Sequence, residues 1–81
     1  MTIKRLLIAN RGEIASRIIS SAHDMGISCV AIYTEADKDT PYVREADQAF
    51  KLSDSYLNSK EILDIALKSN SDAIHPGYGL S

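Results

Sequence analysis

The sequence predicts an α/β protein in which a four-stranded parallel sheet carries helices on both faces, a three-layer arrangement. Short apolar runs alternate with segments of helical spacing along all 81 residues. Strands that alternate with helices form parallel sheets with right-handed crossovers. No repeat, low-complexity tract or linker interrupts the pattern, so we expect one unit. We expect the strand order 3-2-1-4, which makes the first and fourth strands neighbours.

The first strand and helix follow from a change of period near the N-terminus. The apolar run from Ile3 to Ala9 has the length of a buried parallel strand. After "NRGE" the spacing is helical from Glu13, and Gly26 is placed to end the helix in a left-handed conformation. The apolar face expected of this helix comprises Ile14, Ala15, Ile18, Ile19, Ala22 and Met25.

The middle of the chain predicts two strands around a short helix. "SCVAIYT" has the composition of a second buried strand, and "EADKDTP" of a polar turn. Pro41 suits the first turn of a helix that runs through Glu45. "QAFKLS" alternates weakly between apolar and polar residues, which predicts a third strand.

The last helix and strand come from "SYLNSKEILDIALKSNSDAIHP". Asn58 and Glu61 have the spacing of a capping box, with Ser59 as the competing N-cap. Asn70 suits the C-terminal end of the helix, and Pro76 ends the fourth strand, "DAIHP". The expected apolar stripe of this helix comprises Ile62, Leu63, Ala66 and Leu67.

Composition excludes several classes of protein. Nine Lys and Arg against eleven Asp and Glu give a net charge of −2 without a basic run, so we expect no nucleic-acid partner. No apolar stretch approaches the roughly 20 residues of a membrane span. Cys29 lies in an apolar run, as a buried structural thiol does, and one cysteine suits a reducing compartment. We therefore expect a cytoplasmic protein.

The loops after the first and fourth strands are the best candidates for a ligand site. Ligands of open parallel sheets bind beyond the carboxyl ends of strands where the strand order reverses, and there "NRGE" would face "HPGYG". Gly77 and Gly79 allow close approach of a ligand, and Tyr78 offers a flat face with a polar tip. A plain turn with its tyrosine packed on the domain is an equally good interpretation.

The first loop also bears a partial dinucleotide-binding pattern. Asn10, Gly12 and Ala15 match a relaxed G-x-G-x-x-G/A spacing, and Glu35 follows the second strand where a ribose-binding acid would lie. Only one of three glycines is present, and Glu13 at the helix N-terminus would repel a pyrophosphate. We therefore interpret the loop as a structural turn in which Glu13 satisfies free amides.

Other polar residues have structural interpretations at least as good as functional ones. His75 ends a strand before proline and is more often a scaffold residue than a general base, and His23 on a helix flank is expected to be solvated. Arg11 would bind an anion, a distant carboxylate or Glu13.

The acids of the turn after the second strand, and metal-binding or catalytic signatures generally, give weak signals. A solvated turn is the better interpretation than a cation site for Glu35, Asp37 and Asp39. We find no zinc-type cluster, catalytic triad or P-loop in the sequence.

The stretch "IANRGEIASRII" closely resembles the opening of biotin carboxylase, the unit that begins acetyl-, propionyl- and methylcrotonyl-CoA carboxylases, pyruvate carboxylase and urea carboxylase. The likeness continues through "GISCVAIYTEADKDTPYVREADQAFKL", "SYLN" and "DAIHPGYG", so it covers essentially the whole chain. "IANRGEIA" and "HPGYG" at this separation are highly specific.

The resemblance implies that residues 1–81 are the N-terminal part of the biotin carboxylation domain, a Rossmann-like (preATP-grasp) unit. The ATP-grasp and C-terminal domains would be absent from these residues. The family is a ligase that uses ATP, magnesium and bicarbonate to carboxylate N1 of biotin on a carrier protein, as in the acetyl-CoA carboxylase of fatty acid biosynthesis. We expect the isolated chain to be inactive, to bind none of these cofactors, and to self-associate or pair with the remaining domains.

The resemblance also implies roles for the closing loop. Tyr78 and Gly79 match the family residues beside the biotin ring system, and His75, Pro76 and Gly77 would shape the loop. The matching residues of the first loop, also expected to shape it, are Asn10, Arg11, Gly12 and Glu13.

Two departures limit the transfer. The family usually has two residues between the second glycine and a serine, whereas only Leu80 separates Gly79 from Ser81, so Leu80 and Ser81 are left unaligned. The bacterial subunit dimerises partly through its first helix, where Arg17 and Asp24 match but Ser20 replaces a residue that is often basic.

Two other classes are alternatives to a carboxylase part. One is a non-catalytic α/β binding or assembly module. The other is a dinucleotide-binding Rossmann domain, which the missing glycines disfavour. The choice of acyl-CoA or keto acid belongs to the carboxyltransferase and is not expected to be encoded in these residues.

Overall fold

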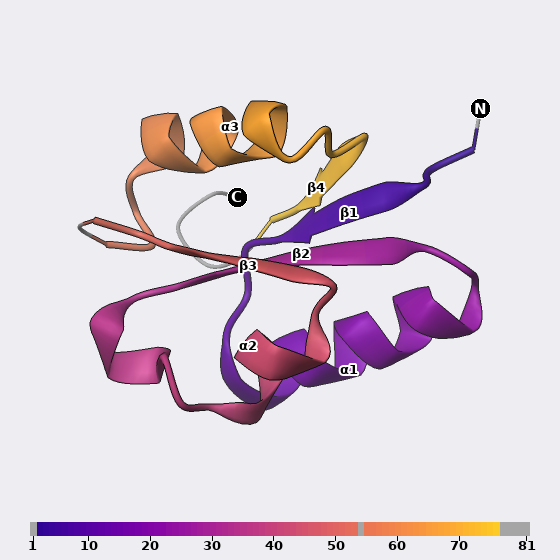
Figure 1. Ribbon diagram of the computed structural model, residues 1–81, viewed down its shortest axis with the longest axis horizontal. Helices are drawn as coiled ribbons and strands as arrows, with labels where there is room; N and C mark the ends of the chain where they lie inside the picture. The colour runs from indigo at the N-terminus through magenta and orange to yellow at the C-terminus, as the bar shows by residue number, and fades with distance from the viewer. Residues whose placement is uncertain (1, 54, 77–81) are drawn as a thin grey trace.

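The computed structural model describes residues 2–53 and 55–76 and forms a sheet between two layers of helices (Figure 1). Helices α1 and α2 cover one face of the sheet, and α3 covers the other. This is the three-layer α/β fold that the sequence predicts. The elements, in chain order, are β1 (Arg5–Ile8), α1 (Gly12–Asp24), β2 (Ser28–Tyr33), a 3₁₀ turn η1 (Glu35–Asp37), α2 (Pro41–Glu45), β3 (Gln48–Lys51), α3 (Ser59–Lys68) and β4 (Ala73–His75).

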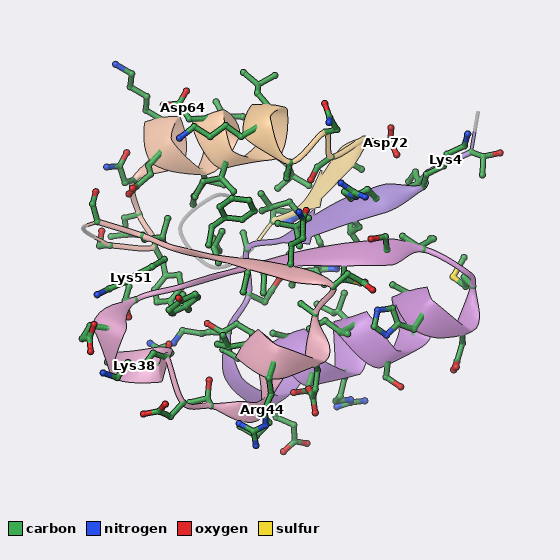
Figure 2. All side chains as sticks on the ribbon, in the orientation of Figure 1. Lys4, Lys38, Arg44, Lys51, Asp64 and Asp72 are labelled. Carbon is green, nitrogen blue, oxygen red and sulfur yellow. The ribbon has the colours of Figure 1, made fainter. Side chains whose placement is uncertain are left out.

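All strand pairs are parallel, and the order is β3-β2-β1-β4, as predicted. The central strand β1 places Leu7 between Val30 of β2 and Ile74 of β4. The carboxyl ends of the four strands therefore meet at one edge of the sheet. Lys38 and Lys51 lie toward this edge, and Lys4 and Asp72 lie at the opposite end of the molecule (Figure 2).

Each face of the sheet has its own apolar core, because side chains alternate between the faces along every strand. The core under α3 is built on Leu7, Val30 and Ile32 of the strands. The core under α1 and α2 is built on Ile8, Cys29 and Ala31, and it includes the Tyr42 ring. Cys29 is fully buried, as expected.

Left-handed backbone conformations mark both ends of α1 and the end of α3. Gly26 has φ +75° after α1, and Asn70 has φ +58° after α3, as the sequence predicts for these ends. Helix α1 begins one residue earlier than expected, at Gly12, whose φ is +63°. A β-carbon at Gly12 would have open space around it, so backbone strain alone favours glycine there.

The predicted apolar faces of the two long helices are partly wrong. Ile14 of α1 and Met25, the residue that follows this helix, are exposed, Met25 by 75%, while Ala15, Ile19 and Ala22 pack on the sheet. In α3, Leu63 and Leu67 are exposed and Ile65, absent from the predicted stripe, is buried. On each helix the sheet covers a stripe that is narrower than the full set of apolar residues. The way the helix packs on the sheet decides which apolar residues are covered.

The N-terminus of α3 forms half of the predicted capping box. Asn58 is the N-cap, and its Oδ1 accepts a hydrogen bond from the Glu61 amide at 3.1 Å. The Glu61 carboxylate does not return to Asn58; it accepts from the Ser53 amide, at 3.0 Å to Oε2. Glu61 thereby ties the start of α3 to the segment that follows β3.

Among the helices of residues 2–53 and 55–76, none is long and apolar enough to cross a membrane.

Candidate functional site

The loop that follows β1 is joined to His75, the last residue of β4, at the carboxyl edge of the sheet. The Ala9 amide donates to the His75 carbonyl at 3.0 Å. The His75 Nδ1 lies 3.1 Å from Oδ1 of Asn10, and because that oxygen only accepts, Nδ1 carries the proton. His75 therefore ties the end of β4 to the loop after β1, as a scaffold residue would.

The chain leaves this joint through Pro76, which is exposed and follows β4 directly. Gly77, Tyr78 and Gly79, with Leu80 and Ser81, lie outside the described residues. The predictions made for these residues therefore stay predictions. The described part of the chain fixes only where their loop starts, beside Asn10.

An ion pair joins the first loop to the turn after β2. Arg11 contacts Asp37 through two parallel hydrogen bonds, Nε to Oδ2 at 2.9 Å and Nη2 to Oδ1 at 3.1 Å. The Arg11 side chain is 58% exposed and that of Asp37 only 11%. Of the partners considered for Arg11, the structure selects the distant carboxylate over Glu13. Bidentate pairs of this kind fix orientation as well as adding energy.

Two tyrosines extend this contact into the core. The Tyr56 hydroxyl donates to Oδ2 of Asp37 at 2.6 Å and accepts from the Thr34 amide at 3.0 Å. The Arg11 guanidinium lies over the Tyr56 ring, 5.2 Å from its centroid. The buried Tyr42 hydroxyl is 2.9 Å from the Ile32 carbonyl and 3.0 Å from the Tyr56 hydroxyl. No local spacing connects either tyrosine with Arg11, so neither was predicted from the sequence as a member of this network.

This network shifts the ionisation of its members. The hydrogen bonds from Arg11, and then from Tyr56, lower the pKa of Asp37 below its ordinary value. The Asp37 hydrogen bond and charge raise the pKa of Arg11. Burial, and then the Tyr56 hydrogen bond, raise the pKa of Tyr42. All three groups are therefore held in one charge state near neutral pH, which suits a scaffold rather than a proton-transfer site.

The turn after β2 is not the solvated acidic turn that we expected. Asp37 is buried because Arg11 and Tyr56 neutralise and cover it, and its carbonyl accepts from the Thr40 hydroxyl at 2.7 Å. Asp39 is exposed, as predicted. Glu35 is exposed as well, so Asp37 is the one acid of the three that departs from the expectation.

Glu35 lies on the outer side of the same turn, between two lysines. Its carboxylate pairs with Lys38 at 2.6 Å and with Lys51 of β3. Their hydrogen bonds, Lys38 first, lower the pKa of Glu35 to about 2. Glu35 thus closes one side of an open hollow of about 540 Å³, whose other lining residues include Arg11, Thr34, Lys51, Ser53 and Tyr56.

The start of α1 does not suit a pyrophosphate. Arg11 is the N-cap, its side chain makes no cap hydrogen bond, and its guanidinium is committed to Asp37. Glu13 brings a carboxylate to the first turn, where a phosphate would need the positive end of the helix dipole. The loop leads from β1 directly into α1, and the Ala15 amide donates to the Arg11 carbonyl at 3.3 Å. Among the described residues, none donates a hydrogen bond to the Glu13 carboxylate, so the expectation that it satisfies free amides is not met.

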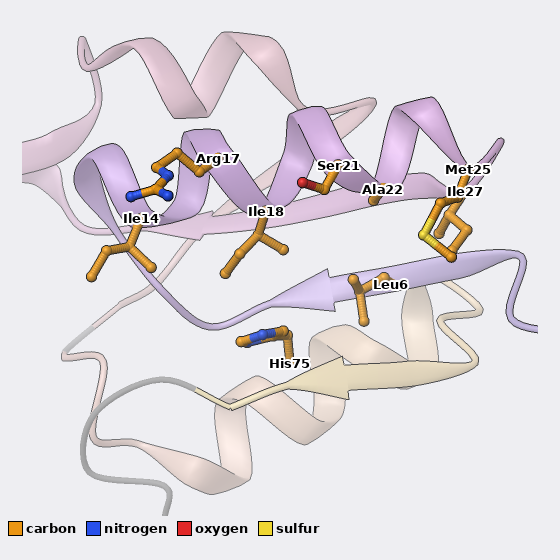
Figure 3. A pocket seen from close by; sticks show the side chains of 9 residues that line it. All are labelled: Leu6, Ile14, Arg17, Ile18, Ser21, Ala22, Met25, Ile27 and His75. Carbon is orange, nitrogen blue, oxygen red and sulfur yellow. The ribbon is translucent and has the colours of Figure 1, made fainter.

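A second hollow, of about 460 Å³, runs along α1 where this helix faces β1 and the end of β4 (Figure 3). Its lining is mostly apolar, and His75 closes it on the β4 side. Arg17, which the resemblance assigns to a dimer face, lies at its rim on α1. The remaining lining residues are Leu6, Ile14, Ile18, Ser21, Ala22, Met25 and Ile27.

His23 is not simply solvated, as the sequence had suggested. Its Nε2 lies 2.8 Å from Oδ2 of Asp47, the residue before β3. The same Oδ2 accepts the Cys29 amide at 2.7 Å. Those hydrogen bonds, Cys29 first, lower the pKa of Asp47.

Comparison with known proteins gives one consistent result. The family model for the biotin carboxylase N-terminal domain matches residues 2–81. The chain is 55% identical to biotin carboxylase 1 of Bacillus subtilis over 95% of its own length. It superposes with TM-score 0.90 on the biotin carboxylase domain dimer of Hydrogenobacter thermophilus 2-oxoglutarate carboxylase, in complex with MgADP, ADP and bicarbonate, at 43% identity over 99% of the chain. The same score is reached with Rhizobium etli pyruvate carboxylase, at 37% identity over 99% of the chain.

The chain spans only a small part of each of these proteins. It covers 18% of the Bacillus protein, 18% of the Hydrogenobacter chain and 9% of the Rhizobium chain. The sequence and the fold of this part match throughout, but most of each relative lies outside the compared region.

Proposed function

Because this chain belongs to the biotin carboxylase N-terminal domain family, we propose that it forms the first part of the biotin carboxylation domain of an ATP-dependent biotin carboxylase. The observation that carries the proposal is the family match over residues 2–81 together with 55% identity to a biotin carboxylase. In this proposal residues 1–81 are the N-terminal part of that domain, and the enzyme also contains an ATP-grasp domain and a C-terminal domain.

The biotin side of the reaction is proposed to lie at the carboxyl edge between β1 and β4. Tyr78 and Gly79 would contact the biotin ring system, and Gly77 would help to shape their loop. The support is the joint between His75 and Asn10, which starts this loop beside the end of β1. The role of the described residues is to orient: His75 holds the loop on one side and Arg11, through Asp37, holds the first loop on the other.

ATP, magnesium and bicarbonate are proposed to bind the other domains. They supply the activated carboxyl group that is transferred to biotin. The described residues do not form a phosphate site at the N-terminus of α1, because the Glu13 carboxylate lies in the first turn and the Arg11 guanidinium is paired with Asp37. The complex of the Hydrogenobacter relative with MgADP and bicarbonate supports these ligands for the proposed enzyme.

The proposed partners are a biotin carrier protein or domain, the remaining domains of the enzyme, and a second copy of it. The Hydrogenobacter relative is described as a domain dimer. Arg17 and Asp24 on the exposed side of α1 are the residues of this chain that we assign to such a contact, with Ser20 between them.

The experiment is an assay of the full-length protein that carries this chain. We expect ATP cleavage that requires bicarbonate and rises on addition of free biotin, with carboxybiotin as product. The 81 residues alone, assayed at the same concentration, serve as the control and should give no ATP cleavage. Bicarbonate-dependent turnover without any response to biotin would reject the proposal.

A further inference from the structure

Three residues with different metal-binding side chains come together at the amino ends of β2 and β3. They are His23 near the end of α1, Cys29 in β2, and Asp47 just before β3. Their ligand atoms, an imidazole nitrogen, the thiol sulfur and a carboxylate oxygen, all lie within 4.8 Å of one another. This cluster is separate from the network of Arg11 and Asp37, because it lies at the opposite ends of the strands.

The cluster could not be predicted from the sequence, which shows no zinc-type pattern. Its members are not spaced as the closely paired ligands of common zinc motifs are. The parallel pairing of β2 with β3 brings Asp47 to Cys29, where the Asp47 amide donates to the Cys29 carbonyl at 2.9 Å. The last turn of α1 then sets His23 over both.

We propose that His23, Cys29 and Asp47 form a binding site for a thiophilic divalent cation, Zn²⁺ being the best match, with water in the fourth position. Mixed nitrogen, sulfur and oxygen ligands suit Zn²⁺, and three protein ligands leave one open position. The site is reached from solvent, since the His23 and Asp47 side chains are 40% and 46% exposed. The buried Cys29 forms its floor.

The distances fit such an ion after a small adjustment. Ligand atoms about 2.0–2.3 Å from one tetrahedral ion lie about 3.3–3.8 Å apart. The atoms of this cluster lie within 4.8 Å of one another, and His23 Nε2 and Asp47 Oδ2 are 2.8 Å apart. The ion would widen this pair and draw in the sulfur. The backbone amide of Cys29 would still donate to the Asp47 carboxylate. Hydrogen bonds of this kind orient the ligands in metal sites.

The proton balance is simple. Without a metal, Nε2 of His23 carries the proton that it shares with Asp47, because Oδ2 only accepts. On binding, this proton leaves Nε2, and the neutral imidazole carries its one proton on Nδ1, so that the Nε2 lone pair binds the ion. Cys29 releases its thiol proton to solvent and binds as the thiolate.

The test uses the reduced, metal-free chain and two ions. Calorimetry with Zn²⁺ should give one ion per chain. Co²⁺, as a spectroscopic substitute, should show a thiolate-to-metal charge-transfer absorption. His23→Gln, an exposed change that leaves the fold intact, should weaken Zn²⁺ binding by at least about tenfold, and Cys29→Ala should abolish the Co²⁺ band. Asp24→Asn, the matched control, should leave both unchanged.

Three results would overturn the proposal. The first is the absence of saturable one-to-one Zn²⁺ binding, which would leave the His23–Asp47 hydrogen bond as the whole purpose of the cluster. The second is a Co²⁺ complex without thiolate absorption. The third is a loss of affinity in Asp24→Asn as large as in His23→Gln, which would indicate a diffuse acidic surface.

Discussion

The ion pair between Arg11 and Asp37 is the contact that shapes the carboxyl edge of the sheet. Asp37 accepts two hydrogen bonds from Arg11 and one from Tyr56. In Asp37→Asn the shape is kept but the charge is lost, so the free energy of unfolding should fall by about 1–3 kcal/mol. Urea unfolding at pH 7 measures the change. Asp39→Asn, at an exposed position of the same turn, should have almost no effect.

The same pair predicts how stability changes with pH. The pKa of Asp37 is lower in the folded protein than in the unfolded chain. Its contribution is therefore complete above about pH 4, the unfolded pKa, and is lost as the pH falls through the folded pKa. The gap in stability between wild type and Asp37→Asn should be constant from pH 7 to 5 and shrink below pH 4. Asp47 and Asp72, whose pKa values are also lowered, act equally in both proteins. A gap that keeps its size at pH 3 would contradict the role of the charge.

Helix α3 offers a test of its cap with a neighbouring control. Asn58 accepts the Glu61 amide and begins the helix, whereas Ser59 lies within the first turn. Asn58→Ala should therefore lower the free energy of unfolding by about 0.5–2 kcal/mol. Ser59→Ala should change it by less than about 0.5 kcal/mol. If the serine variant proves the more damaging one in thermal or urea unfolding, the helix begins a residue later than the structure has it.

The two faces of α3 give a second comparison. Ile65 is 5% exposed and Leu67 78% exposed, although the sequence pattern favoured Leu67 for the core. Ile65→Ala should cost about 2–5 kcal/mol of stability, and Leu67→Ala less than about 0.5 kcal/mol. Equal costs in denaturant unfolding would mean that α3 packs on the sheet through a different face, or that Leu67 is covered by another copy of the chain.

The whole sheet has two free edges within the residues that the structure describes. Strand β4 is short and pairs only with β1, and β3 pairs only with β2. Exposed polar residues such as Gln48 and Lys51 protect β3, while β4 offers Ala73 and Ile74, with Pro76 limiting its length. We predict that the isolated chain self-associates through this edge. Sedimentation over a concentration series should show a rising mean mass.

Stability measured on the same samples completes this test. A chain of this size has little core to spare, so we expect the monomer to be weakly stable. A strictly monomeric species at every concentration, unfolding cooperatively with several kcal/mol of stability, would contradict the prediction. The full-length protein should not associate through β4 if further parts of the domain cover that edge.

The helices and strands could be predicted from the sequence because each depends on a pattern within a short segment, and their alternation then indicates a parallel sheet. Apolar runs, helical spacing, Gly26 and Asn70 each carry their own local signal. The face that a helix buries has a weaker local signal. Leu67 and Ile65 are both apolar residues of α3, and the way the helix packs on the sheet decides that Ile65 is buried and Leu67 exposed. Contacts between residues far apart in the sequence have no local signal. The contacts of Arg11 with Asp37 and of His23 with Asp47 depend on the pairing of β2 with its neighbouring strands. The assignment of Tyr78 and Gly79 to the biotin site depends on the family resemblance alone.

The central claim is that the loop after β4 forms part of the biotin site. The most direct measurement compares Tyr78→Ala with Tyr78→Phe in the full-length protein. Two rates are followed: biotin carboxylation, and bicarbonate-dependent ATP cleavage without biotin. Stacking on a flat ring contributes about 0.5–1.5 kcal/mol, so the alanine variant should lose up to about tenfold in carboxylation, keep its ATP cleavage, and be largely restored by phenylalanine. Equal losses of both rates in Tyr78→Ala would contradict the claim and make Tyr78 a residue of the scaffold.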